Sequence, residues 1–291
     1  MAQAIWTRLP QRGVVEIGGA EAAHFLQNLV TNDIDAIADG GSGYGALLSP
    51  QGKVQFDFII FRDGTQFLFD LPRERIAAFV ARLTFYRLRS SVEIVDRSDE
   101  RDIVAARGDA SIPASFRLAA PDPRLSSLGI RAIAERGVEV GDAPPGDAAS
   151  HHHHRIALGV PEGGVDFTYE EAFPHDANID QLGGIAFAKG CYIGQEVVSR
   201  MEHRGTARRR VVMVRGDGPL VRGAKLTAAD QAIGTIGSVA DKIGLALVRT
   251  DRAGRAFAAN APIIADGNEV TLTIPEWANF NWPVAGSSPD S

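Results

Sequence analysis

Residues 44–70 read YGALLSPQGKVQFDFIIFRDGTQFLFD, and this stretch predicts three β-strands joined by two tight turns. The turn signals are S-P-Q-G at residues 49–52 and R-D-G at residues 62–64. Between them lie runs rich in aromatic and β-branched residues, which is typical of strands. Short connections of this kind join neighbouring antiparallel strands, so we expect a three-stranded meander.

The flanking sequence extends the meander into a layered unit. A strand is predicted at Val14–Ile17, and a helix over residues 20–30 from its apolar spacing. A second helix should follow Pro72, with a buried stripe of Ile76, Phe79, Val80 and Leu83. Val92–Val95 reads as a further strand. The resulting β-α-β-β-β-α-β order predicts an α+β fold with helices on one face of a mainly antiparallel sheet.

The rest of the chain predicts two further parts. A short helix over residues 124–136 would support a second small α+β unit. After Arg210, short β-rich runs alternate with Gly, Asp and Pro, a pattern typical of a small β-barrel. We therefore expect an N-terminal domain at residues 1–95, a second α+β domain at 96–206, a barrel at 207–285 and a tail at 286–291.

Composition excludes several classes of protein. The 291 residues are 45% hydrophobic and 23% charged, as in ordinary globular proteins. A net charge of −6 argues against a nucleic-acid-binding surface, and no apolar run approaches the roughly 18 residues of a membrane span. The first ten residues lack the apolar core of a signal peptide. With one cysteine there is no internal disulfide, so we predict a cytoplasmic location.

The lone cysteine lies in the octapeptide K-G-C-Y-I-G-Q-E, residues 189–196. A short strand is predicted at Ile185–Ala188 before it and a helix from Gln195 after it. A thiol at a helix start, near the ammonium group of Lys189, should have more thiolate at neutral pH. The alternative is that Cys191 is a buried small hydrophobic residue, and the pattern alone leaves both readings open.

The octapeptide resembles the signature of the YgfZ family, which is related to the glycine-cleavage aminomethyltransferases. Similarity continues through F-P at 173–174, Asn178, L-G-G-I at 182–185 and the segment 155–163. Near the N-terminus, F-L-Q at 25–27, V-T-N-D at 30–33 and residues 48–52 also match. The segment 158–163 is closest to the branch that contains the mitochondrial iron–sulfur assembly factor.

This resemblance implies a ring-like, aminomethyltransferase-like arrangement of α+β (ferredoxin-like) domains with a C-terminal β-barrel and a central cavity the size of tetrahydrofolate. It implies a folate-binding accessory protein that assembles or repairs [4Fe–4S] proteins, with assembly factors and client enzymes as partners. Cys191 and Lys189 would be the reactive residues. The expected folate contacts are Asn32, Asp57, Tyr192, Gln195, Glu196 and Arg208.

One departure from the related aminomethyltransferases keeps other functions open. Those enzymes carry paired aspartates in the strand after the Gly-containing turn, whereas this chain reads Phe56-Asp57. A single carboxylate can still contact a pterin, but it argues against classical methylene transfer. The alternatives are a tetrahydrofolate-dependent one-carbon transferase and a folate-independent redox-sensing thiol protein.

Two clusters of basic residues have both functional and structural readings. Arg204 and the arginines at 208–210 could be exposed side chains at a strand edge. Alternatively, they could dock the anionic glutamate tail of a folate, because a guanidinium suits carboxylates. The tract His151–His154 could hold a transition metal. However, neighbouring side chains diverge, so at most two imidazoles would face one ion. We expect a structural role for the tract and no metal site.

Overall fold

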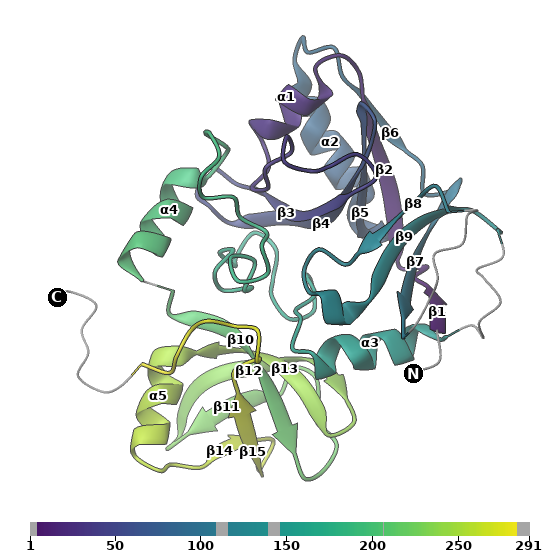
Figure 1. Cartoon of the computed structure of the whole chain (residues 1–291). Helices are drawn as coiled ribbons and strands as arrows, with labels where there is room; N and C mark the ends of the chain where they lie inside the picture. Colours follow the sequence, from purple (N-terminus) through teal and green to yellow (C-terminus); the bar gives the residue numbers. More distant parts are fainter. Residues whose placement is uncertain (1–4, 109–115, 139–145, 206, 284–291) are drawn as a thin grey trace. The chain divides into compact units, whose positions relative to one another are not determined.

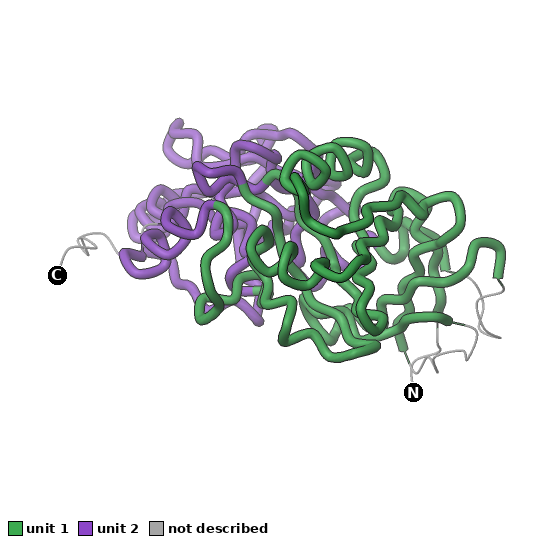
Figure 2. The backbone as a smooth tube through the Cα atoms, turned by 90° about the horizontal axis from the view of Figure 1, so that it is seen from above, with its two compact units in different colours: residues 1–48, 55–151, 182–193 green, residues 49–54, 152–181, 194–291 purple. Residues whose placement is uncertain are grey.

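The computed structural model describes residues 5–108, 116–138, 146–205 and 207–283. Contacts divide the chain into two compact units, and neither is continuous in sequence (Figure 2). Unit 1 comprises Met1–Leu48, Gln55–His151 and Leu182–Ile193, and unit 2 comprises Ser49–Val54, His152–Gln181 and Gly194–Ser291. The domain boundaries at residues 95, 206 and 285 stay a prediction.

The first sheet of unit 1 has the strand order β3-β4-β5-β2-β6. The strands are β2 (Arg12–Gly18), β3 (Ser42–Leu48), β4 (Val54–Asp63), β5 (Gln66–Pro72) and β6 (Glu93–Asp96). Strand β5 is antiparallel to both β4 and β2. The meander predicted from residues 44–70 is therefore confirmed, as are the flanking strands and the two helices between them.

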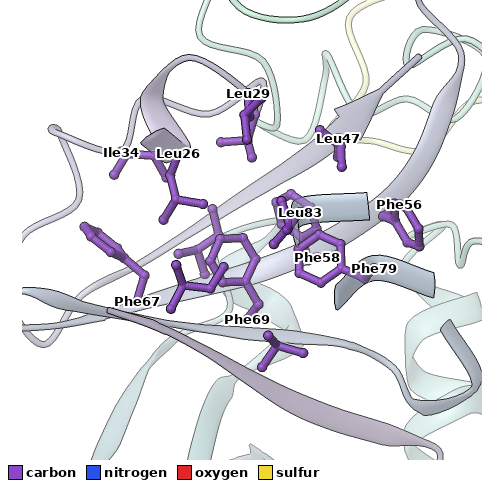
Figure 3. Close-up of a cluster of buried hydrophobic side chains, with 14 of the residues drawn as sticks. Leu26, Leu29, Ile34, Leu47, Phe56, Phe58, Phe67, Phe69, Phe79 and Leu83 are labelled. Atoms are coloured by element: carbon purple, nitrogen blue, oxygen red, sulfur yellow. The ribbon is translucent and has the colours of Figure 1, made fainter. Parts of the chain in front are cut away.

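Helices α1 (Ala22–Gln27) and α2 (Ile76–Arg87) cover one face of this sheet (Figure 1). Alternate residues of the strands point to that face, so Phe56 and Phe58 of β4 join one buried cluster with Phe69 of β5 (Figure 3). The ring of Phe79, from α2, lies 5.4 Å from that of Phe58 and 5.5 Å from that of Phe69. Both ring pairs are tilted, and aromatic contacts at these separations favour a dense core.

The second sheet of unit 1 has the order β1-β7-β9-β8. The strands are β1 (Ile5–Arg8), β7 (Arg101–Arg107), β8 (Leu118–Pro121) and β9 (Ile130–Glu135). The helix predicted over residues 124–136 is wrong, because this segment forms the short 3-10 helix η2 (Ser126–Leu128) and then β9. Ala and Arg favour helix locally, but β9 pairs with β7 on one side and β8 on the other, and this pairing prevails.

Buried charges connect the two sheets of unit 1. Arg131 of β9 donates from Nε to Oδ2 of Asp70 on β5 at 2.6 Å, and Arg12 of β2 binds the other carboxylate oxygen. Asp70 is fully buried and Arg131 almost so. Burial would raise the pKa of Asp70, but the charges of Arg12 and Arg131 hold it below its ordinary value. The carboxylate is therefore ionised and shared between two cations.

Unit 2 contains a closed six-stranded barrel with the order β10-β13-β12-β11-β14-β15 (Figure 1). The strands are β10 (Arg209–Gly216), β11 (Lys225–Ala228), β12 (Gln231–Ala240), β13 (Ile243–Arg249), β14 (Ile263–Ala265) and β15 (Asn268–Thr273). The barrel predicted after Arg210 is thus confirmed. The sequence reading missed α5 (Thr250–Ala258), whose Ala253 and Ala256 pack on the barrel core.

Two further α-helices, α3 (Ala148–Ala157) and α4 (Gln195–Arg204), and the 3-10 helix η1 (Arg73–Arg75) complete the described structure. Helix α4 follows the octapeptide cysteine. In the part of the chain that the structure describes, none of the helices has the length and apolarity needed to cross a bilayer.

Candidate functional site

The segment before α4 is a loop. The strand predicted at Ile185–Ala188 is absent from the described structure, and the backbone there turns, with Lys189 N donating to Ala186 O at 3.3 Å. Helix α4 begins at Gln195, and its N-cap Gly194 has φ of +81°, a left-handed conformation that suits glycine. Cys191 therefore precedes the helix by four residues and does not lie in its first turn. We call residues 183–193 the signature loop.

Lys189 anchors the signature loop through its ammonium group. Its Nζ donates to the carbonyl oxygens of Val30 at 2.8 Å and Asn32 at 2.5 Å. The side chain is buried, and burial lowers the pKa of Lys189 to about 8, an effect that Asp33 and Asp35 partly oppose. The ammonium is thus committed to the backbone of residues 30–32. Its role as a reactive group stays a prediction.

Thr31 provides a second anchor. Its hydroxyl donates to the carbonyl oxygen of Gly184 at 2.6 Å and accepts from the amide of Ala46 on β3 at 2.9 Å. Thr31 is fully buried. One side chain therefore joins the signature loop to the first sheet, and both backbone groups would lose their partner without it.

Cys191 is an exposed free thiol on this anchored loop. The flanking Gly190 is exposed too, whereas Lys189 and Tyr192 on either side are buried. The alternative reading of Cys191 as a buried hydrophobic residue is therefore wrong. Because its neighbours are fixed, the loop presents the thiol to solvent from a defined position.

Tyr192 turns inward where Cys191 turns outward. Its side chain is buried, and its ring centroid lies 5.6 Å from Lys189 Nζ. Burial raises the pKa of Tyr192 to about 12, so the phenol stays protonated. Among the described residues, its buried hydroxyl has no hydrogen-bond partner. Such a group is costly to leave unsatisfied, so the position suits an acceptor from a ligand or a water molecule.

Asn32 and Asp57 meet through Tyr44. Asn32 Nδ2 donates to the backbone oxygen of Tyr44 at 2.6 Å, and the Tyr44 hydroxyl donates to Asp57 Oδ2 at 3.1 Å. Asp57 is buried, on the face of β4 opposite to Phe56 and Phe58. Unit 1 therefore links two of the predicted folate contacts. Tyr44 itself escaped the sequence reading because an isolated tyrosine in a strand pattern carries no site signal.

The remaining predicted folate contacts, Gln195, Glu196 and Arg208, lie in unit 2. Gln195 and Glu196 form the first turn of α4, and Glu196 is exposed. Of the arginines at 208–210, Arg208 alone is exposed. Arg209 pairs with Asp176 at 2.8 Å, and the buried Arg210 pairs with Asp180 at 2.6 Å. Arg210 is therefore not an exposed arginine, whereas Arg209 keeps 38% of its side chain exposed while it pairs with the buried Asp176.

Helix α4 rests on the turn that precedes β4. Gly52 in this turn has φ of +75°, and a Cβ placed there would lie 2.9 Å from Cβ of Val197. A side chain at this position would meet both backbone strain and a steric clash. The S-P-Q-G turn thus packs closely against the first turn of α4.

The histidine tract lies on α3, so His151 and His154 share a face. His152 lies 3.1 Å from Arg155, and burial with this guanidinium lowers the pKa of His152. Among the described residues, the one group of three closely spaced potential metal ligands is His175, Asp180 and Glu202, outside the tract. The sequence carried no sign of this group, because Glu202 on α4 lies more than 20 residues along the chain from His175 and Asp180.

Comparisons with known proteins place the chain among relatives. A family model described as the CAF17 C-terminal β-barrel domain matches residues 208–280. The mitochondrial iron–sulfur cluster assembly factor IBA57 of Homo sapiens is 30% identical over 97% of this chain and 87% of its own length. The IBA57 homologue of Mycosarcoma maydis is 32% identical over 70% of this chain. The chain spans about half the length of the latter protein, 55%, and 52% of the Neurospora crassa homologue.

A solved structure supports the fold assignment. The glycine cleavage system aminomethyltransferase T from Bartonella henselae superposes with a TM-score of 0.73 at 16% identity, covering 94% of this chain and 85% of that one. The predicted aminomethyltransferase-like fold with a C-terminal barrel is thus confirmed. The named relatives are mitochondrial proteins, so the predicted cytoplasmic location is wrong.

Proposed function

The chain belongs to the family of the iron–sulfur cluster assembly factor IBA57, within the aminomethyltransferase-like YgfZ proteins that its sequence resembles. On this premise we propose that it is an accessory protein for assembling or repairing [4Fe–4S] proteins. It acts through the thiol of Cys191 and binds a tetrahydrofolate. Its partners are assembly factors and client [4Fe–4S] enzymes.

The observation that carries this proposal is the exposure of Cys191 on a loop whose neighbouring residues are fixed. Lys189 and Thr31 hold the loop to the backbone of unit 1 through buried hydrogen bonds. A thiol presented in this way is accessible to another protein without rearrangement of the loop. Loop residues positioned by a rigid scaffold commonly carry function.

One thiol sets a limit on the chemistry. A [4Fe–4S] cluster normally takes four cysteine thiolates, and this chain has one cysteine. A stable cluster therefore needs ligands from a second protein. We infer that Cys191 contributes a single ligand to a cluster shared transiently with a partner. The thiol loses its proton to solvent as its sulfur binds iron.

The folate part of the proposal rests on polar groups of unit 1. A pterin ring carries N–H donors that a carboxylate can accept, and the buried Asp57 carboxylate, held by Tyr44, offers such an acceptor. The buried hydroxyl of Tyr192 can donate to a ring nitrogen or oxygen. The exposed Arg208 suits the anionic tail, whose exposed charge pairs are screened by salt.

Calorimetry with tetrahydrofolate tests the folate part. The wild-type chain should release heat on binding tetrahydrofolate, and Asp57→Asn should weaken this binding at least about tenfold. Wild-type affinity should rise as the folate tail carries more glutamates. Arg208→Gln should reduce this rise and leave the affinity for the monoglutamate form unchanged. A wild-type titration without heat, together with an unchanged melting temperature, would favour the folate-independent thiol function. Turnover of a one-carbon donor by the pure protein would instead favour a transferase.

Complementation tests the role in cluster assembly. A strain that lacks the gene should lose [4Fe–4S] enzyme activity, and the wild-type chain should restore it. Cys191→Ala should fold normally and fail to restore it. Restoration by Cys191→Ala would contradict the proposed use of the thiol.

A further inference from the structure

Three potential metal ligands converge in unit 2. His175, Asp180 and Glu202 each offer one ligand atom, and the three atoms lie within 4.8 Å of one another. His175 Nε2 lies 3.2 Å from Glu202 Oε2. The first two residues belong to the turns between α3 and α4, and Glu202 belongs to the last turn of α4. The three side chains therefore meet from two separate segments.

We propose that these residues bind one divalent first-row transition-metal ion. One imidazole nitrogen and two carboxylate oxygens are suitable ligands for Zn²⁺, Fe²⁺ or Mn²⁺. Three protein ligands leave at least one position for water, as in open metal sites. The two carboxylates supply the negative charge that a divalent cation needs. This site goes beyond the proposed function and shares neither Cys191 nor the folate contacts with it.

Residues outside the three ligands hold two of them in place. Arg210 Nη1 donates to the backbone oxygen of His175 at 2.8 Å and to Asp180 Oδ1 at 2.6 Å. Gln181 Nε2 donates to Asp180 Oδ2 at 3.0 Å. Ligating carboxylates are commonly hydrogen-bonded by such outer groups, which orient them. A cation bound to Oδ2 of Asp180 would replace the hydrogen bond from Gln181 and leave the one from Arg210 to Oδ1 in place. The positive charge of Arg210 would lower the affinity of the site for the cation.

Burial favours a site with an opening on one side. The side chains of His175 and Asp180 are 1% and 2% exposed, whereas that of Glu202 is 46% exposed. The buried pair supplies fixed ligands, and the half-exposed carboxylate supplies a route from solvent. The structural alternative is a hydrogen bond from His175 to Glu202 that ties α4 to the turns. A cation bound to Nε2 of His175 would displace this hydrogen bond, so the two exclude each other at that nitrogen.

Zinc titration of the full chain tests the proposal. After chelator treatment, calorimetry with ZnCl₂ should give one equivalent, and Glu202→Gln should weaken binding at least about tenfold. Glu202 is exposed enough for the variant to fold, which its melting curve without metal would show. Zinc should raise the melting temperature of the wild type, because it binds only the folded state, and should raise that of Glu202→Gln by less at the same zinc concentration.

Matched controls separate this site from other zinc ligands. His203→Gln changes the exposed neighbour of Glu202 on α4, His153→Gln changes the exposed member of the histidine tract, and Cys191→Ser removes the thiol. All three should bind zinc as the wild type does. Binding that persists unchanged in Glu202→Gln, or that disappears in any control, would overturn the proposal. If Glu202→Gln fails to fold, Glu202→Ala, which also removes the carboxylate, serves in its place, with the same outcomes.

Discussion

The ammonium nitrogen of Lys189 lies 2.8 Å from the carbonyl oxygen of Val30, and this contact joins the signature loop to the segment that follows α1. The two residues are 159 positions apart, so the contact forms only in the folded chain. It gives Lys189 a defined structural task beside the exposed thiol of Cys191. Burial of the charged ammonium costs free energy, so the folded chain should become more stable when Lys189 loses its proton.

The free energy of unfolding should show this dependence at alkaline pH. Burial lowers the pKa of Lys189 from its usual 10.5 to about 8. Between these values the unfolded chain binds more protons at Lys189 than the folded chain does, so stability rises with pH, by at most about 1.4 kcal/mol per unit. Below pH 8 the contribution is constant. Denaturant unfolding of wild type and Lys189→Met from pH 7 to 10.5 measures the difference, and parallel curves would refute the shift.

Thr31→Val should destabilise the protein by about 2 kcal/mol or more. Valine has a similar shape but leaves the carbonyl of Gly184 and the amide of Ala46 without the hydroxyl that now binds both. Thr31→Ser keeps the hydroxyl and is the matched control, with a smaller loss. Urea denaturation of both variants checks the difference, and equal stabilities for the two would show that the hydroxyl is dispensable.

Asp70→Asn should destabilise the protein by about 3–5 kcal/mol, because it leaves two buried guanidinium groups without their shared carboxylate. The pKa of Asp70 is lowered on folding, so its contribution is complete above the unfolded value of about 3.9 and is lost as pH falls through the folded value. Asp99→Asn, at a carboxylate 91% exposed, is the control and should cost under about 0.5 kcal/mol. Similar losses in both variants would contradict the buried network.

Cys191 should react with iodoacetamide in the folded protein at a rate close to that of the denatured chain. The thiol is exposed, and its neighbour Gly190 has no side chain to shield it. Mass spectrometry over time in native buffer and in urea measures both rates. Protection of the thiol in native buffer by a factor of a hundred would mean that the loop conceals it.

Local patterns predicted much of this fold. The order of elements over residues 14–95 follows from the strand-like sequence of β4 and β5 and from the apolar stripe at helical spacing on α2. In these elements the spacing of apolar residues in the sequence agrees with their burial in the structure. Strand β9 shows where such reading fails. Its Ala, Arg and Glu residues favour helix, and only its pairing with β7 and β8, distant in sequence, makes it a strand.

The site was predicted less completely than the fold. The octapeptide singled out Cys191 and Lys189, whose roles as reactive residues stay a prediction. Sequence spacing placed the thiol at a helix start, whereas α4 begins four residues later, at Gln195. The arginines at 208–210 looked equivalent. The carboxylate partners of Arg209 and Arg210, Asp176 and Asp180, lie about 30 residues away, so these ion pairs and the burial of Arg210 were visible only in three dimensions.

The most direct test of the central claim is the activity of a [4Fe–4S] enzyme in extracts of the deletion strain, with a cluster-free dehydrogenase as reference. Expression of the wild-type chain should restore the ratio of the two activities. Cys191→Ala, produced at the same level and with an unchanged melting temperature, should leave the ratio as low as in the deletion strain. Full restoration by Cys191→Ala would contradict the account, because the exposed thiol would then have no part in the function.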